Sequence, residues 1–243
     1  MNWMPGIFVI PLRDVVRGAV DPLLLKSERS IAALFAPLIA AVAATWFVTV
    51  PLHELLHAAG CLLSGGTVNE LMLQPLYGGR IFERFIPFVH AGGDYAGRLS
   101  GFDTGGSDFG YFVTVLFPYI LTLLLGFPML ARARKTGNPL PHAVGIVHTL
   151  LPLVSLPGDY YELGSIVATR IAGFAPGSEE ARLIRGDDLV HVLGSVAGSD
   201  IPGGFIVVGA GVLLALLFIW STWWCSLAIA RIFGRKALEN REG

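Results

Sequence analysis

The sequence predicts an all-α integral membrane protein of about four transmembrane helices, with a small β-hairpin or sheet after the helix that carries a metal-binding motif. Three observations support this fold class. Hydrophobic residues make up 53% of the 243 residues and charged residues only 14%, whereas soluble domains carry about 25% charged residues. Four long windows carry no charged side chain, and the segments between them differ in charge in a regular way.

Each window is long enough for the roughly 20 residues that a membrane-spanning helix needs. Backbone groups in hydrocarbon must bond within their own segment, so each window should be helical. The uncharged windows are Ser30–His53, Phe109–Ala131, Thr136–Gly158 and Ile201–Ala230. With the apolar residues that flank them, we place the spans at about 31–63, 109–131, 139–158 and 203–230.

Basic residues indicate the orientation of these spans. Arg132, Arg134 and Lys135 link the second span to the third, and Arg231 follows the fourth. Because cytoplasmic loops carry an excess of Lys and Arg, the link and both termini should be cytoplasmic. An even number of spans agrees with that. We therefore expect a multi-pass protein of a bacterial or archaeal cell membrane.

The segment after the first span differs from the spans in its composition and in its pattern of apolar and polar residues. Thr67–Gln74 alternates in part between apolar and polar residues, and Pro75–Gly79 has the composition of a turn. This pattern predicts a β-hairpin or small sheet in a β-rich loop over about 65–90. The glycine-rich residues 91–108 are expected to form an irregular, mobile connector.

The first span contains an H-E-x-x-H motif, His53-Glu54-Leu55-Leu56-His57, after which the apolar stretch resumes. Residues four apart on a helix lie on one face, so both imidazoles can reach a single ion. Ionisable residues are expensive to bury in an apolar stretch and are usually kept there for function. The motif predicts His53 and His57 as Zn²⁺ ligands and Glu54 as the catalytic base that takes a proton from water.

Catalytic zinc normally takes three protein ligands and leaves a fourth position open. Asp159 follows the third window and His53 ends the first. Both windows begin at the predicted cytoplasmic side, so the two residues should lie on the same, far side of the membrane. Asp159 is the expected third metal ligand, and Glu162, one turn further, is its rival. The alternative for Asp159 is a helix cap or an interfacial carboxylate.

Other polar residues are weaker candidates. A hydroxyl from Tyr160 or Tyr161 could stabilise an oxyanion, although aromatic residues are also common at span ends. Cys61 is expected to be a small buried residue rather than a fourth ligand. Among the remaining histidines, we expect His148 to be packed within its span, and three others to lie at the surface or interface: His90, His142 and His191.

Two further stretches extend the motif. After Ala58 to Gly66, the chain continues Val68-Asn69-Glu70-Leu71-Met72-Leu73-Gln74-Pro75-Leu76-Tyr77-Gly78-Gly79; later come Thr149-Leu150-Leu151-Pro152 and Leu156-Pro157-Gly158-Asp159. Together these residues resemble the site-2 protease family of intramembrane zinc metallopeptidases, in which a glycine turn and a strand follow the motif helix and a later span brings an Asp. The resemblance implies His53, His57 and Asp159 as ligands and Glu54 as general base, in a single membrane-embedded metallopeptidase-like domain over 1–243.

The leading hypothesis is a zinc-dependent endopeptidase that cuts membrane-embedded or membrane-adjacent proteins. Its partners would be a membrane protein or peptide substrate and the lipid bilayer. A net charge of −1 gives no support for nucleic acid, and nothing in the sequence indicates an oligomeric state.

Two alternatives stay open. Thr149 stands where the family has Asn, and Gly158 precedes the Asp instead of following it. These departures motivate a zinc-binding pseudo-peptidase that holds membrane partners without cleavage. The other alternative is a transporter or structural protein in which the motif is accidental.

Overall fold

The computed structural model describes residues 10, 11, 13–18, 20 and 31–239, without the side chains of 31–34 and 234–239. The chain forms two compact units. Unit 1 comprises Met1–Phe47, Tyr119–Pro152 and Trp220–Gly243, and unit 2 comprises Val48–Pro118 and Leu153–Ile219. All of the predicted metal-site residues belong to unit 2.

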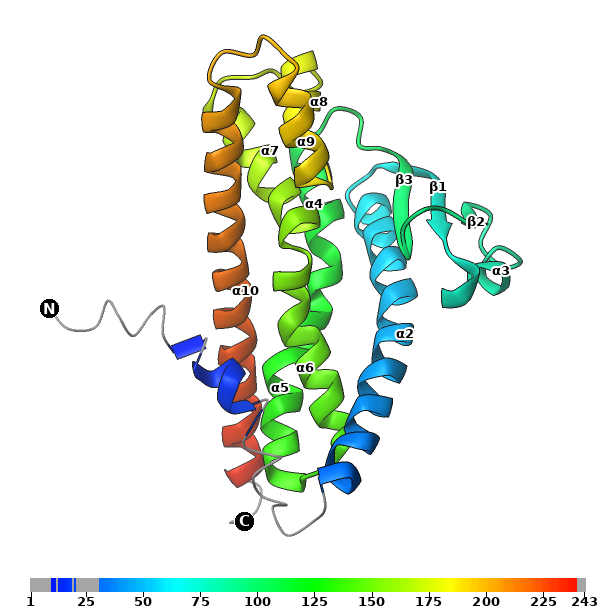
Figure 1. Cartoon of the computed structure of the whole chain (residues 1–243), viewed down its shortest axis with the longest axis vertical. Coiled ribbons are helices and arrows are strands. Elements are labelled where there is room, and N and C mark those ends of the chain that lie inside the picture. The colour runs from blue at the N-terminus through cyan, green and yellow to red at the C-terminus, as the bar shows by residue number, and fades with distance from the viewer. Residues whose placement is uncertain (1–9, 12, 19, 21–30, 240–243) are drawn as a thin grey trace, which may run out of the picture. The chain divides into compact units, whose positions relative to one another are not determined.

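Helices make up most of the described chain (Figure 1). They are α2 (Ile31–Leu63), α4 (Asp108–Leu116), α5 (Ile120–Thr136), α6 (Pro139–Val154), α7 (Tyr161–Ile171), α8 (Glu179–Ile184), α9 (Leu189–Ala197) and α10 (Gly204–Glu239). Three stretches of the described residues are long and apolar enough to cross a membrane: Phe35–Leu63, Asp108–Thr136 and Gly204–Phe233. This is compatible with residence in a membrane.

The third predicted span, 139–158, is not a single helix. Helix α6 ends at Val154, a π-helical turn η3 follows over Leu156–Tyr160, and the two parts form a pair bent by 40°. Pro157 lacks the N–H that would continue the helical bonding, and Gly158 has non-helical torsions (φ −106°, ψ −114°). The backbone therefore turns just before Asp159.

Unit 2 contains a three-stranded sheet, formed by β1 (Thr67–Leu73), β2 (Val89–Ala91) and β3 (Gly97–Asp103) in the order β2-β1-β3. Strand β1 pairs in parallel with β2 and antiparallel with β3, where Thr67 faces Asp103 and Leu73 faces Gly97. Between β1 and β2 lie η1 (Pro75–Tyr77) and the short helix α3 (Gly79–Phe82). The predicted small sheet is confirmed.

Two details of that prediction are wrong. Residues 91–108 are not an irregular connector, because they contain β3. The strand was hidden because it carries Gly97 and Gly101 and pairs with β1 through register shifts near Glu70, so its sequence has no clean alternation. The expectation that the strand around Thr67–Gln74 offers a free edge to an extended segment is also wrong, because β1 is the central strand of the sheet and the edge adjacent to the predicted site belongs to β3.

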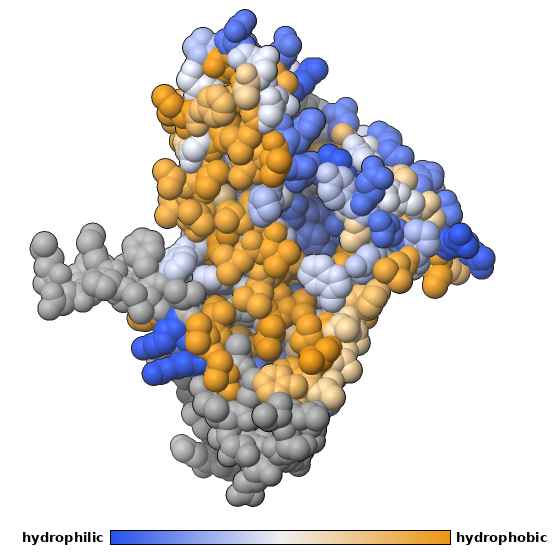
Figure 2. Space-filling view, viewed as in Figure 1, coloured by the Kyte–Doolittle hydropathy of each residue, from blue (hydrophilic) through white to orange (hydrophobic). Residues whose placement is uncertain are grey.

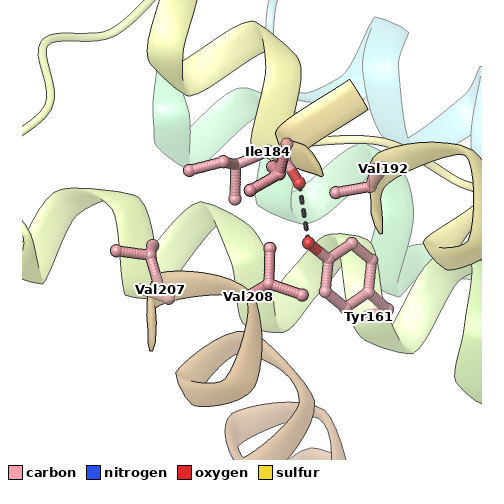
Figure 3. Close-up of a cluster of buried hydrophobic side chains, with 7 residues drawn as sticks. Tyr161, Ile184, Val192, Val207 and Val208 are labelled. Atoms are coloured by element: carbon pink, nitrogen blue, oxygen red, sulfur yellow. Dashed lines mark hydrogen bonds between the residues drawn. The ribbon is translucent and has the colours of Figure 1, made fainter. Parts of the chain in front are cut away.

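The core of unit 2 forms around Tyr161, where α7, α8, α9 and the start of α10 meet. The ring lies among apolar side chains that include Ile184, Val192 and Val208, and its hydroxyl donates to the carbonyl of Ile184 at 2.9 Å (Figure 3). A Cβ on Gly164 would lie 2.0 Å from the carbonyl oxygen of Gly211, so α7 and α10 approach backbone to backbone. This core fixes the helix that follows η3.

The surface of unit 2 is divided by polarity. Apolar residues dominate the exposed side of α10, including Ile206, Leu213 and Leu217, whereas hydrophilic residues dominate the sheet (Figure 2). Contiguous exposed apolar surface is rare on soluble monomers, so this face of α10 is suited to lipid.

Unit 1 is held together by polar contacts between apolar helices. The Ser226 hydroxyl on α10 donates to the Thr122 carbonyl on α5 at 2.8 Å and accepts from the Phe127 N–H at 3.2 Å. The Trp223 indole donates to the Thr149 carbonyl on α6 at 2.9 Å. In each contact a side chain of α10 bonds to the backbone of a neighbouring helix.

Candidate metal centre

His53 and His57 project from one face of α2, as their four-residue spacing predicts. Their Nε2 atoms lie 3.1 Å apart, and the rings meet edge to face. Both side chains are buried, with 8% and 7% of their surfaces exposed. Two imidazoles of a largely apolar helix thus converge on one point.

Asp159 reaches the same point from η3. Its Oδ2 atom lies 2.9 Å from Nε2 of His53 and 3.4 Å from Nε2 of His57. Because the turn at Gly158 redirects the chain, Asp159 faces α2 from the bend of the helix pair. π-Helical turns of this kind occur frequently at functional sites. Among the described residues, His53, His57 and Asp159 form a group that could hold a metal ion.

The distances between the three donor atoms fit such an ion. Zinc binds imidazole nitrogen and carboxylate oxygen at about 2.0–2.2 Å, so donors at tetrahedral angles lie about 3.4 Å apart. The observed separations are 2.9, 3.1 and 3.4 Å. Shifts of a few tenths of an ångström would seat the ion, and two imidazoles with one carboxylate are ligands that zinc accepts.

Helix α4 orients one of the two histidines. Nδ1 of His57 lies 2.9 Å from the backbone carbonyl oxygen of Thr114. A carbonyl can only accept, so Nδ1 carries the proton and donates. The lone pair of Nε2 is then directed at Asp159 and His53, which is the tautomer that metal binding requires.

Glu54 lies beside this group and against strand β3. A Cβ on Gly97 would be only 2.4 Å from Cγ of Glu54, so the absence of a side chain at Gly97 lets the strand approach the carboxylate. Glu54, His57, Asp159 and Glu162 line a cavity of about 80 Å³ that β3 borders. A cavity of this size has room for several water molecules.

Glu162 is buried in the same cavity, but it lies outside the histidine–aspartate group. Its Oε1 atom accepts a hydrogen bond from the Tyr111 hydroxyl of α4. Helix α4 therefore supports the site twice, since Tyr111 and Thr114 lie three residues apart on one face.

The loop between α8 and α9 contributes to the wall of the cavity. Asp187 pairs with Arg98 of β3 at 2.7 Å, and both residues line the cavity. Next to it, Asp188 accepts from the Tyr95 hydroxyl at 3.4 Å. The backbone N–H groups of His191 and Val190 also donate to Asp188 and hold the pKa of its carboxyl below the usual value. Four contacts thus tie this loop to β3, to the segment before it and to α9.

The remaining candidates lie elsewhere or serve packing. Tyr160 and Tyr161 are fully buried, and the Tyr161 hydroxyl is engaged by Ile184. Cys61 is buried next to the Thr67 carbonyl. His148 is packed within α6, as predicted, and its ring bonds to the Val144 carbonyl. His90 and His191 are exposed, but the expectation of a surface position for His142 is wrong, because it is 2% exposed.

Several residues around the site escaped the sequence reasoning: Tyr111, Thr114, Gly97, Arg98 and Asp187. One signal was present, because Tyr111 and Thr114 are the first polar residues of the second apolar window, where polar groups are expensive. The others carry no local signal, since their roles depend on the pairing of β3. No protein-family model, curated protein or solved structure matches this chain, so the case for its function rests on the site itself.

Proposed function

We propose that the chain is a zinc-dependent endopeptidase that hydrolyses peptide bonds in membrane-embedded or membrane-adjacent proteins. The observation that carries the proposal is the convergence of His53, His57 and Asp159 beside the Glu54 carboxylate. Three ligands leave a fourth zinc position open, which is typical of catalytic sites rather than structural ones. The apolar helices supply the membrane context.

The residues of the chain divide the chemistry among them. A zinc ion held by the three ligands supplies a Lewis acid for a water molecule and a peptide carbonyl. The Glu54 carboxylate accepts the proton of the attacking water and returns it to the departing amine. The Thr114 carbonyl keeps His57 in its ligating tautomer. The outer edge of β3, next to Glu54, can hold an extended substrate segment by strand pairing.

The resemblance to the site-2 protease family supports the same assignment. The residues that carry the resemblance around the motif, Ala58 to Gly79, form the end of α2, strand β1 and the turn after it. Four spans with both termini in the cytoplasm belong to this proposal. The bent pair of α6 and α7 is the third of them in chain order.

One observation favours the pseudo-peptidase alternative. The cavity at Glu54 is about 80 Å³, which is too small for a peptide, and the Arg98–Asp187 ion pair closes part of its wall. Cleavage therefore requires the α8–α9 loop to move, whereas holding a metal does not.

The test separates metal binding from cleavage. Wild type and Glu54→Gln are expressed at equal levels in membranes, their zinc content is measured after purification, and new protein N-termini in the two membrane fractions are compared. We expect equal zinc, with a set of N-termini present only for wild type. Equal zinc with identical N-termini would reject the peptidase and leave the pseudo-peptidase.

A further inference from the structure

A second cavity lies in unit 1. It has a volume of about 210 Å³, shares no lining residue with the metal site, and is formed where the C-terminal parts of α5 and α10 meet the helical residues around Asp14. Its lining comprises Phe127, Leu130, Ala131 and Arg134 of α5, Leu227, Ala230 and Arg231 of α10, and Asp14.

The lining is ordered by polarity along both helices. On α5 it repeats every three or four residues, which is one helix face, and it is apolar until it ends at Arg134. On α10 the same spacing leads from Leu227 to Arg231. Both helices are parts of stretches that are able to span a membrane, and both arginines stand near the ends of those stretches. The cavity is thus apolar toward the helix centres and basic toward the helix ends.

This gradient has the polarity of a phospholipid at the membrane boundary. The two guanidinium groups come from different helices and can each donate to a phosphate oxygen. The guanidinium carbon of Arg231 lies 5.9 Å from the centre of the Trp224 ring, a cation–π contact that helps to place it. Aromatic and basic side chains are the usual anchors at headgroup depth.

Asp14 sets the charge of the cavity. The described lining holds two arginines and this one carboxylate, and Arg13 pairs with Asp14 at 3.2 Å, so the region is basic and complements the negative charge of a phosphodiester headgroup. Gly18, one turn after Asp14, is buried against Leu130, where a Cβ would come within 2.6 Å of the leucine side chain. This close contact helps to hold Asp14 in the lining of the cavity.

We propose that this cavity binds one anionic phospholipid, with its phosphate between Arg134 and Arg231 and its glycerol and upper acyl carbons on the apolar lining. The site requires α5 and α10 to cross the bilayer, but it does not depend on metal or on peptidase activity.

Binding is measured by native mass spectrometry of the purified full chain in detergent, with phosphatidylglycerol or phosphatidylcholine added. We expect one phosphatidylglycerol to bind in preference to phosphatidylcholine. The double variant Arg134→Gln/Arg231→Gln should bind phosphatidylglycerol more weakly, by roughly five-fold for each arginine removed.

The matched control is Arg132→Gln/Lys135→Gln, which removes the same charge from exposed positions of α5 outside the cavity. It should bind phosphatidylglycerol as wild type does. Equal weakening in both double variants would show a diffuse charge effect and overturn the site. The single variant Arg231→Gln, at an exposed position, gives the same comparison with Arg132→Gln if the double variant does not fold.

Two further arms distinguish the ligand. Asp14→Asn removes the opposing carboxylate and should tighten phosphatidylglycerol binding; weaker binding would contradict the proposed role of Asp14. Inorganic phosphate at millimolar concentration should leave lipid binding unchanged, because it lacks the apolar part. Full displacement of the lipid by phosphate would replace the lipid site with a simple anion site.

Discussion

In unit 1 the buried polar groups that join the helices are a hydroxyl and an indole, bonded to backbone groups of α5 and α6. In unit 2 they are the two imidazoles that contact the Asp159 carboxylate, and the carboxylates of Glu54 and Glu162 in the lining of the adjoining cavity. The first kind makes neutral hydrogen bonds to backbone groups, which add stability. The second kind gathers groups that are costly to bury without an ion or a substrate. Polar residues of unit 1 thus join helices, whereas those of unit 2 form a group that could hold a metal ion.

The largest expected effect is the loss of metal from unit 2. His53→Ala removes one of three donors and should lower zinc affinity by more than about 100-fold, because even residues that only support a ligand contribute 10–100-fold. Zinc content of the purified protein measures this. His148→Ala, which removes a buried histidine of unit 1, is the control and should retain stoichiometric zinc. Asp159→Ala should behave as His53→Ala; if it keeps its zinc, Glu162 becomes the third ligand.

The next effect tests the approach of β3 to Glu54. Gly97→Ala places a Cβ within 2.4 Å of Cγ of Glu54 and should move the carboxylate, so cleavage should fall by at least about ten-fold while zinc is retained. Gly101→Ala is the matched control on the same strand, since its Cβ would meet Glu70 instead. Equal losses in turnover from both variants would mean that the strand as a whole, and not its contact with Glu54, limits activity.

In unit 1 the effect should be on stability alone. Ser226→Ala leaves the Phe127 N–H and the Thr122 carbonyl without the hydroxyl that bonds both, which should cost about 1–3 kcal/mol in the free energy of unfolding. Thermal unfolding in detergent measures the loss, and zinc content should stay at the wild-type level. A drop in zinc would show that the two units are not independent in function.

The smallest expected effect concerns the ion pair between β3 and the α8–α9 loop, which lines the cavity. Arg98 and Asp187 are 44% and 34% exposed, and exposed ion pairs contribute about 0.2–1 kcal/mol. Arg98→Ala should therefore speed removal of zinc by a chelator only about 1.5- to 5-fold. High salt should also speed the removal of zinc from the wild type, and it should leave the rate for Arg98→Ala unchanged. An unaltered rate in the variant would mean that the ion pair does not control access.

The sequence predicted those features that follow from local geometry. The motif spacing predicted the pairing of His53 with His57, and the alternation of windows and charged links predicted that Asp159 lies at the same end of the fold. The sequence did not predict features that depend on contacts between segments far apart in the chain. Strand β3 exists because it pairs with β1, and its glycines conceal it. The break after α6, at Ser155, follows from Pro157 and Gly158. In the sequence these two residues counted only as part of the uncharged third window. Arg98 and Asp187 become neighbours only after both of these features form.

The separation of the ligands along the chain has a consequence for synthesis. His53 and Asp159 are 106 residues apart, and ribosomes add about 5–20 residues per second. The two histidines therefore leave the ribosome roughly 5–20 seconds before the aspartate does. During that interval α2 carries only a two-ligand site, so lasting capture of an ion has to wait until the chain beyond α6 has been made and placed.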